Sequence, residues 1–431
     1  MISDFLRKRL SKYFTQQDEI IFTNRVPDNE LISKDIHSIS SLGIYLHIPF
    51  CERICPYCPY NKEIHNKTTS KNYVKAILNE IDFYAPLLNN KPISSFYIGG
   101  GTPTTLLGRG IEKIIDHIYN KFNMHCHIHM ESHPNHLTKE KLDNIESMGV
   151  KYLSVGVEAL QDKHLMAIER PYSVSEVRRT IERVVNRNFE CVNIDFIFDL
   201  PGQTEKEVYE AGHIMIDMGI QQVATYPLFR FPYTPLGKSA HKNKSAVATM
   251  FRRRRLLKIL EDIFYNAGFE RSSVWAFTQK GTEKYCSVTI PSYLGLGASG
   301  GTYLKDIFYV NTFSVAEYIN SIAKGNTPIA LSLDMSKEMQ MAGWLYWRIY
   351  ETKFNKRDFQ FRFNTGFDEK FGKPFKILNK IGFLKNGHDQ ITLTDKGTYW
   401  IHAFEDFFSI DYINKLWGTS RTNPWPENVR L

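Results

Sequence analysis

Three cysteines lie close together in the stretch IPFCERICPYC, residues 48 to 58, of this 431-residue chain. Cys51, Cys55 and Cys58 have the spacing C-x3-C-x2-C, and the remaining cysteines are isolated, namely Cys126, Cys191 and Cys286. A structural zinc site needs four ligands and usually two paired C-x2-C motifs, so zinc would require a remote fourth ligand. Disulfides fit no better, because three close cysteines cannot all pair. An iron–sulfur cube held by three thiolates leaves one iron open to a substrate or cofactor, and we favour this catalytic arrangement.

Further candidate functional groups follow short apolar runs along the chain. The motif GGGTPT follows one such run at residues 99–104, and three carboxylates, Glu131, Glu158 and Asp195, lie at or near the ends of others. Glycines let backbone amides approach a ligand closely because they have no Cβ. Each carboxylate could instead cap the helix that follows it. The arrangement of the strands that carry these groups determines whether the groups lie close together in the fold.

From about residue 44 the chain alternates short apolar runs with longer amphipathic stretches, a pattern typical of parallel α/β sheets and barrels. The runs predict six strands, at 43–48, 94–100, 125–131, 151–158, 191–198 and 222–229. The stretches predict helices at 71–88, 110–122, 138–149, 173–188 and 204–219. Right-handed crossovers would close this series into a barrel or partial barrel. Because the chemistry of parallel barrels lies at the C-terminal ends of the strands, the candidate groups would all meet at one mouth.

The pattern changes after about residue 310. Residues 377–401, ILNKIGFLKNGHDQITLTDKGTYWI, predict a helix, two short strands around NGHD and a further helix, which is a winged-helix-like arrangement. We therefore predict an α/β fold with a partial (βα)6 TIM-like barrel over residues 41–315. A smaller winged-helix-like α+β module is expected over residues 316–431, and an N-terminal extension, flexible or capping, over residues 1–40.

The composition is that of a globular protein, with 42% hydrophobic and 23% charged residues. The N-terminus lacks the apolar run of a signal peptide, and no run approaches the roughly 20 apolar residues that span a bilayer. We therefore expect a cytoplasmic protein without a membrane span. The formal net charge is +8, but acidic residues are interleaved with the basic ones. The densest basic run, Arg252–Arg255, is interpreted as a solvated helix with one or two inward arginines, or as an anchor for a substrate carboxylate.

The cysteine spacing at the end of the first predicted strand resembles the signature of radical S-adenosylmethionine (SAM) enzymes. Five ordered motifs narrow the resemblance to the oxygen-independent coproporphyrinogen III oxidase family and its relatives, between residue 43 and about residue 400: YLHIPFCERICPYC, YIGGGTPT, LSVGVE, NIDFIFDLPGQT and YLGLGAS. The resemblance implies a [4Fe–4S] cluster on Cys51, Cys55 and Cys58, whose open iron binds SAM. An electron from the cluster would split SAM into methionine and a 5′-deoxyadenosyl radical, which abstracts hydrogen from an organic substrate.

The resemblance also implies roles for individual residues. Tyr45, Gly100, Gly101, Thr102 and Glu131 match positions that bind SAM. The set expected to bind cofactor is completed by Tyr57, Glu158, Arg170, Asp195, Leu228 and Gly301. Tyr57 and Glu158 are also expected to be catalytic. Arg170 and Asp195 match positions that contact a second SAM molecule in the oxidase, so one or two SAM molecules are expected.

Departures from the family pattern affect the substrate more than the core chemistry. Glu158 replaces the family's glutamine, Asp199 replaces a glycine, Tyr60 replaces an additional cysteine, and Gly301 replaces a larger side chain. Two reactions stay open: oxidative decarboxylation of a porphyrinogen, and radical methylation as in the class C methyltransferases and cyclopropane-forming enzymes. The expected partners are a small-molecule substrate, a tetrapyrrole or another organic molecule, and a low-potential electron donor such as flavodoxin or ferredoxin. We expect a monomer that binds no nucleic acid.

Three alternative interpretations have support in the sequence. One is a haem chaperone, although the stretch before YLGLG lacks the His-Asn and Tyr-Trp pairs of the chaperone's haem-binding motif. Another is a nucleic-acid-binding regulator, although the winged-helix-like end is not especially basic. The third is a metal site on His125, His127 and His129, which alternate and would share one face of a strand. His133, nearer the end of that strand, could touch SAM or the substrate.

Overall fold

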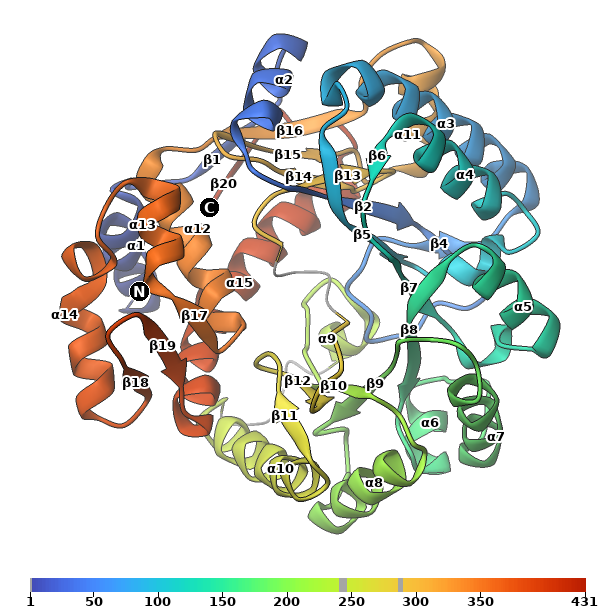
Figure 1. The fold of residues 1–431 in the computed structure, drawn as a ribbon, viewed down its shortest axis with the longest axis vertical. Coiled ribbons are helices and arrows are strands. Elements are labelled where there is room, and N and C mark those ends of the chain that lie inside the picture. The colour runs from blue at the N-terminus through green and yellow to red at the C-terminus, as the bar shows by residue number, and fades with distance from the viewer. Residues whose placement is uncertain (1, 240–245, 286–289) are drawn as a thin grey trace.

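The computed structural model describes residues 2–239, 246–285 and 290–431, and one large curved sheet dominates this part of the chain (Figure 1). Within the described residues the sheet has 15 strands, in the order β11-β12-β10-β9-β8-β7-β5-β2-β13-β14-β15-β16-β1-β20, with β6 paired to β5. Their bounds are β1 Ile21–Thr23, β2 Leu42–Ile48, β5 Pro92–Gly100, β6 Asn123–Met124, β7 Ile128–Ser132, β8 Val150–Glu158, β9 Cys191–Phe198, β10 Gln222–Pro227, β11 Phe269–Arg271, β12 Ala276–Gln279, β13 Tyr293–Leu296, β14 Gly301–Tyr303, β15 Ile307–Asn311, β16 Ile329–Asp334 and β20 Asn428–Arg430. The end strands β11 and β20 do not pair in the described part, so the barrel is partial, as predicted.

The middle of the sheet, from β10 to β13, is parallel, and it contains all six predicted strands. The bounds of β9 agree with the prediction. The third predicted strand begins later than expected, at Ile128, because residues 125–127 form no strand and connect the short strand β6 to β7. Both flanks of the parallel part are antiparallel. The predicted α/β class is therefore confirmed.

Helices alternate with the parallel strands and cover the outer face of the sheet (Figure 1). The sequence of α4 shows why, since Ile111, Ile114, Ile115 and Ile118 recur at helical spacing and are all buried. The helices of this layer are α2 Asn29–Ser38, α3 Lys67–Leu88, α4 Ile111–Lys121, α5 Lys139–Ser147, α6 Asp162–Ala167, α7 Val174–Val185, α8 Glu205–Asp217, α10 Ala246–Asn266 and α11 Val315–Ala323. The short helix α9, Pro235–Ser239, follows β10. No helix in the described ranges is long and apolar enough to cross a membrane.

The alternation of side chains along the parallel strands separates an apolar outer face from a polar inner face. On β2, Ile44, Leu46 and Ile48 belong to the core under the helices. The intervening Tyr45 and His47 point to the other face, because successive side chains of a strand point to opposite sides. The inner face of the sheet is therefore where the candidate groups gather.

The C-terminal part has a second core, which is rich in aromatic side chains and includes Trp344, Phe359, Phe367 and Phe371. It contains the predicted order of helix, two strands and helix, and adds a third strand before them. Its elements are α12 Lys337–Tyr350, β17 Lys353–Asn355, α13 Lys356–Phe363, α14 Phe367–Lys380, β18 Leu384–Asn386, β19 Gln390–Leu393 and α15 Asp395–Thr422. The strands form a small sheet in the order β17-β19-β18.

The large sheet crosses both predicted segment boundaries. Strand β1, from the N-terminal forty residues, pairs with β16 and β20, which lie beyond residue 315. In α2, one oxygen of the buried Asp35 carboxylate accepts hydrogen bonds from the backbone of Lys305, Asp306 and Ile307. The N-terminal segment also contains helix α1, Ile2–Thr15, which contacts α12. The division into three segments stays a prediction.

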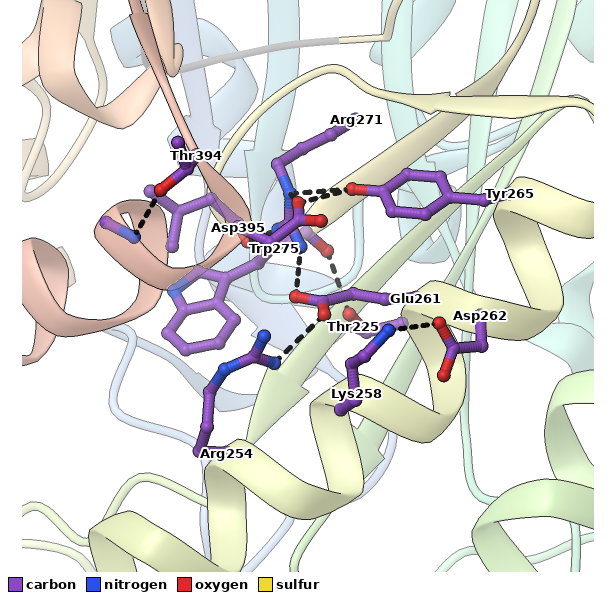
Figure 2. Close-up of polar contacts among 12 residues, drawn as sticks. Thr225, Arg254, Lys258, Glu261, Asp262, Tyr265, Arg271, Trp275, Thr394 and Asp395 are labelled. Carbon is purple, nitrogen blue, oxygen red and sulfur yellow. Dashed lines mark hydrogen bonds and ion pairs between the residues drawn. The ribbon is translucent and has the colours of Figure 1, made fainter. Parts of the chain in front are cut away.

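A buried ion network joins the barrel to the C-terminal module (Figure 2). Glu261 of α10 is completely buried and pairs with Arg254, at 2.9 Å, and with Arg271 of β11. Arg271 also contacts Asp395, the first residue of α15, at 3.2 Å. Tyr265 donates a hydrogen bond to the same carboxylate. Because a buried charge without its partner is strongly destabilising, this network fixes the start of α15 against the barrel.

Candidate active site

The three clustered cysteines lie directly after β2, where two short strands, β3 Phe50–Cys51 and β4 Glu63–Ile64, frame the loop that carries them. Cys51 is buried, while Cys55 and Cys58 are half-buried, and all three thiols are free of disulfides. Burial raises the pKa of Cys51 to about 11, with smaller contributions from the neighbouring Cys58 and Cys55. Thiolates at this place therefore need a compensating positive charge, which iron supplies.

The glycine loop after β5 is locked against the cysteine loop. Gly101 lies so close to Phe50 that a Cβ there would come within 2.9 Å of the Phe50 backbone. The Thr102 backbone N–H donates to the Phe50 carbonyl at 2.9 Å, and its hydroxyl donates to the Cys51 Sγ at 3.5 Å. Gly100 has a φ of +117°, and a Cβ there would lie 2.7 Å from the His47 ring. The backbone of this loop is therefore held open beside the cysteines, where no larger residue fits.

Glu131 lies at the end of β7, under the glycine loop. Its carboxylate accepts hydrogen bonds from the Tyr97 hydroxyl, at 2.6 Å, and from the Gly100 N–H, at 3.0 Å. Tyr285 donates in turn to the Tyr97 hydroxyl at 2.6 Å. Burial raises the pKa of Glu131 to about 7, although both hydrogen bonds act in the opposite direction. No cation of the described residues pairs with this carboxylate beside the glycine loop, and it suits a ligand that carries an ammonium or hydroxyl groups.

Tyr57, Glu158 and Arg170 meet on the other side of the cysteine loop. The Arg170 guanidinium pairs with the Glu158 carboxylate and donates to the Tyr57 hydroxyl at 2.9 Å. Glu158, the last residue of β8, has a φ of +70°, which is uncommon for a residue other than glycine. The Nε of Arg170 is buried and has no hydrogen-bond partner among the residues that the structure describes. This donor belongs to a hydrogen-bonded trio, Tyr57, Glu158 and Arg170, beside Cys55. Burial raises the pKa of Cys55, and the Arg170 charge acts against that rise.

Asp195 lies inside the barrel on β9. Its carboxylate accepts hydrogen bonds from the Ser154 hydroxyl, at 2.9 Å, and from the Asn193 side chain, at 3.1 Å. Burial, together with the charges of Glu158 and Glu131, raises the pKa of Asp195 to about 8. The three carboxylates predicted from separate strands therefore share one electrostatic environment.

A cavity of ≈ 1460 Å³ lies between the inner face of the sheet and the C-terminal module. Tyr45, Gly100, Glu131 and Gly301 are among the residues that line it, so it is continuous with the glycine loop. The Tyr45 hydroxyl lies 2.8 Å from the Nδ1 of His47. Leu228, in contrast, is buried in the core after β10, and its backbone N–H and carbonyl are already bonded to Phe198 and Arg253.

Sequence reasoning missed several residues of the site. His47 bridges Tyr45 and the backbone of Asn61, and burial lowers its pKa to about 4. The signal was available, because His47 follows Tyr45 at the two-residue period of a strand. Tyr97 could have been predicted as a site residue by the same two-residue period, because it lies two positions before Gly99. Tyr285 could not have been predicted from the sequence, because it reaches the Tyr97 hydroxyl from a loop that is distant in the chain.

The metal interpretation of the three alternating histidines is wrong. His125 contacts the side chain of Asn123 at 2.8 Å, His127 lies 3.6 Å from Glu190, and His129 stacks on Tyr152 with ring centroids 4.2 Å apart. Within the described part of the chain, no three His, Cys, Asp or Glu side chains converge on a single metal position. The three cysteines are no exception, because in a cubane each thiolate binds a different iron. His133 caps the short helix that follows it.

The arginine run 252–255 is already paired with acidic side chains. Arg252 and Arg253 both bind the Asp199 carboxylate, at 2.8 and 2.9 Å. Arg254 pairs with Glu261, and Arg255 with Glu205. Asp199, where the family has a glycine, thus occupies the place that a substrate carboxylate would take. Cys286, the remaining isolated cysteine of the sequence, lies outside the described residues.

Comparison with protein families gives a match to the radical SAM superfamily over residues 45–213. The chain is 26% identical to the heme chaperone HemW of Bacillus subtilis, over 82% of this chain and 95% of that protein. It is 25% identical to the anaerobilin synthase of Escherichia coli O157:H7, over 83% and 81%. Identity to the oxygen-independent coproporphyrinogen III oxidase of Synechocystis is 22%, over 87% and 86%.

Among solved structures, the coproporphyrinogen III oxidase HemN from Escherichia coli, a radical SAM enzyme, superposes with a TM-score of 0.77 at 18% identity. The match covers 90% of this chain and 94% of that one, and it shows that the two share a fold. Radical SAM proteins bind a [4Fe–4S] cluster and SAM, and the three free thiols, the open glycine loop and the uncompensated Glu131 fit these groups. Residues 45–213 are therefore a radical SAM domain, in a chain whose homologues include HemW and oxygen-independent coproporphyrinogen III oxidase.

Proposed function

We propose that the protein is an enzyme that cleaves SAM reductively and uses the resulting radical to abstract hydrogen from an organic substrate. The observation that carries this proposal is the contact between the two loops, in which Thr102 joins the glycine loop to Cys51 beside the Glu131 carboxylate. A [4Fe–4S] cluster bound by the three cysteines would supply the electron for the cleavage.

The residues of the chain would bind and orient SAM around this contact. Glu131 would accept hydrogen bonds from the SAM ammonium or ribose hydroxyls, in addition to those from the Tyr97 hydroxyl and the Gly100 N–H. The backbone of Gly100 and Gly101 would lie along the amino-acid part of SAM, and Tyr45 beside it. These roles, like those expected for Thr102, Leu228 and Gly301, are part of the proposal.

Tyr57, Glu158 and Arg170 form a hydrogen-bonded trio beside the cysteines, and we propose that it takes part in the reaction there. Arg170 holds both the Tyr57 hydroxyl and the Glu158 carboxylate, so it fixes the two residues that we propose as catalytic. Its unpartnered Nε and the nearby Asp195 are the groups that a second SAM molecule would contact. A second SAM is needed for methyl transfer and not for hydrogen abstraction alone.

The products of the reaction test this proposal. The protein is reconstituted anaerobically with iron and sulfide, mixed with SAM and dithionite, and the small molecules are separated by mass spectrometry. We expect 5′-deoxyadenosine and methionine from the native chain, and none from Cys51→Ala, Cys55→Ala or Cys58→Ala. Cys126→Ala, which removes an isolated half-buried thiol, is the matched control and should retain cleavage. Cleavage retained by all three cluster variants would refute the proposal.

Two versions of the reaction are separated by the same measurement. Deoxyadenosine without S-adenosylhomocysteine indicates an oxidase-type reaction, for which the names of the oxidase relatives suggest a porphyrinogen as substrate. S-adenosylhomocysteine in addition indicates that a second SAM gives up its methyl group. The proposal also includes a low-potential donor such as flavodoxin or ferredoxin, a cytoplasmic location and a monomeric state.

A haem chaperone is the second candidate function, and the observation that favours it is the name of several relatives. Heme chaperone HemW proteins from Bacillus subtilis and Lactococcus lactis are 26% and 24% identical to this chain over most of its length. Titration with haem distinguishes the two functions, because specific tight binding without SAM cleavage would favour the chaperone.

A further inference from the structure

The cavity beside the glycine loop is large for a small-molecule site. Its volume of ≈ 1460 Å³ exceeds the roughly 300–1,000 Å³ that such sites usually have. The inner face of β13, β14 and β15 forms one wall, and α1, α12, α14 and α15 contribute residues to the others. SAM at the glycine loop would therefore leave most of the cavity for a second molecule.

Aromatic side chains from every wall line this cavity. Phe14 comes from α1, Tyr303 from β14, Trp347 from α12, Phe375 from α14 and Trp400 from α15. Aromatic rings pack favourably on flat or cyclic apolar molecules and contribute large contact areas. The walls therefore favour a hydrophobic ligand that contains rings.

Charged residues are few in the described lining, and acids outnumber bases. They are Asp18, Glu131, Glu405, Asp411 and Lys415. The one lysine already pairs with Asp411 at 3.2 Å, and Asp18 pairs with Lys12 at 2.8 Å. Burial, with a smaller contribution from Asp406, raises the pKa of Glu405 well above its ordinary value, and its carboxyl group lies 3.3 Å from the Nδ1 of His402.

No arginine belongs to the lining formed by the described residues. Arg362 interacts electrostatically with Tyr303 from outside the lining and is 3.5 Å from the Ser292 hydroxyl. The nearby run of four arginines is bound to acids of the protein. Arg421, whose charge acts on the lining residue His47, also lies outside the described lining, where it donates to the Pro59 carbonyl and lies over the Tyr233 ring. A ligand with several carboxylates would thus lose its hydration in the cavity without meeting an unpaired cation in the described lining, which is costly.

We propose that the substrate of this site is an uncharged, predominantly hydrophobic molecule with ring systems, and not a polycarboxylate. This inference rests on the proposed function, because it assumes that the radical formed at the glycine loop reacts with what the cavity holds. It favours reaction at a C–H bond of a neutral substrate over oxidative decarboxylation, which requires a carboxylate on the substrate.

Binding of two matched probes tests the proposal. Coproporphyrin III carries four carboxylates, and its tetramethyl ester has the same ring system without the charges. Both are equilibrated by dialysis against the full-length, reconstituted protein and quantified by mass spectrometry. We expect the ester to bind at least tenfold more tightly than the acid. Equal or tighter binding of the acid would overturn the proposal, and so would failure of the ester to bind.

Two arginine variants locate the binding. Ile377 of α14 lines the cavity but is 62% exposed, so Ile377→Arg introduces a charge there without disturbing a core. We expect this variant to shift the preference toward the acid by tenfold or more. Phe361→Arg, at an 89% exposed position of α13 outside the lining, is the matched control and should leave both affinities unchanged. Tight acid binding that is lost in Arg362→Gln would instead assign carboxylate recognition to Arg362 and overturn the proposal.

The test is separate from that of the proposed function. Cys51→Ala should lose SAM cleavage but keep the preference for the ester, because no cysteine lines the cavity within the described residues. An inverted preference in a protein that cleaves SAM would refute only the substrate class. A preserved preference in a native chain that does not cleave SAM would refute only the radical chemistry.

Discussion

Replacing Glu131 by glutamine should stabilise the protein at high pH while weakening its binding of SAM. The buried carboxylate has a pKa of about 7 in the folded chain, against an ordinary value of 4.5, mainly because burial disfavours its charge. A carboxyl whose pKa is raised by folding lowers stability progressively as the pH rises from its unfolded pKa through its folded pKa. Glutamine has nearly the same shape and no charge, so it removes this cost.

The size of the effect follows from the two pKa values. With 4.5 in the unfolded chain and about 7 in the folded chain, the charge costs about 1 kcal/mol at pH 5 and about 3 kcal/mol at pH 8. Tyr97 can still donate to the glutamine oxygen, but the Gly100 N–H loses its carboxylate acceptor, at a cost of roughly 1–3 kcal/mol at any pH. That second cost cancels when the two pH values are compared. The stability of Glu131→Gln relative to the native chain should therefore rise by about 2 kcal/mol between pH 5 and pH 8.

Urea unfolding followed by tryptophan fluorescence, at several pH values and without added SAM, measures this difference. Asp195, whose raised pKa depends partly on the Glu131 charge, changes in the same direction and adds to the effect. Glu140→Gln, on the exposed face of α5, is the control and should show no such trend. A difference between Glu131→Gln and the native chain that does not depend on pH would refute the reasoning. The loss of SAM affinity is measured separately, by equilibrium dialysis at pH 8.

Two further predictions concern the geometry of the site. Arg170→Met leaves the Glu158 carboxylate buried without its cation and should lower the free energy of unfolding by about 3–5 kcal/mol, whereas the double variant with Glu158→Gln should recover most of the loss. Thermal unfolding measures both, and a double variant no more stable than the single one would contradict the pairing. Gly100→Ala places a Cβ 2.7 Å from the His47 ring at a φ of +117°, so it should weaken SAM binding at least tenfold. Gly418→Ala in α15, whose Cβ would meet no atom within 4 Å, should bind SAM like the native chain, and equal binding by the two variants would contradict the proposed role of the glycine loop.

Local sequence patterns were sufficient for the parallel part of the sheet. The strands from β2 to β10 carry apolar side chains on the face under the helices and are mostly buried, and the amphipathic helices between them have one apolar face each. The same local patterns misplaced the start of β7, because the two-residue period does not reveal that the chain first pairs briefly with β5 as β6. His125 and His127 therefore lie before β7 and only His129 lies within it, and each of the three has a different partner.

The cysteine spacing and the glycine motif also lie within short stretches, so the chemistry that they imply could be predicted from the sequence. The sequence by itself determined that three thiols and a glycine loop follow the first two strands, and that three carboxylates lie on the next three strands. Parallel strands then bring these groups to one edge of the sheet, whatever the rest of the chain does.

Only the tertiary structure decided what surrounds that edge. The pairing of Arg170 with Tyr57 joins residues 113 positions apart, and Arg252 and Arg253 bind Asp199 across more than fifty. The cavity is formed by α1, the inner face of the sheet and the C-terminal helices, which meet only when the chain has folded. Its charge could not be predicted from a composition with a net charge of +8, because long-range pairing determines which charges are neutralised and which side chains remain to meet a ligand.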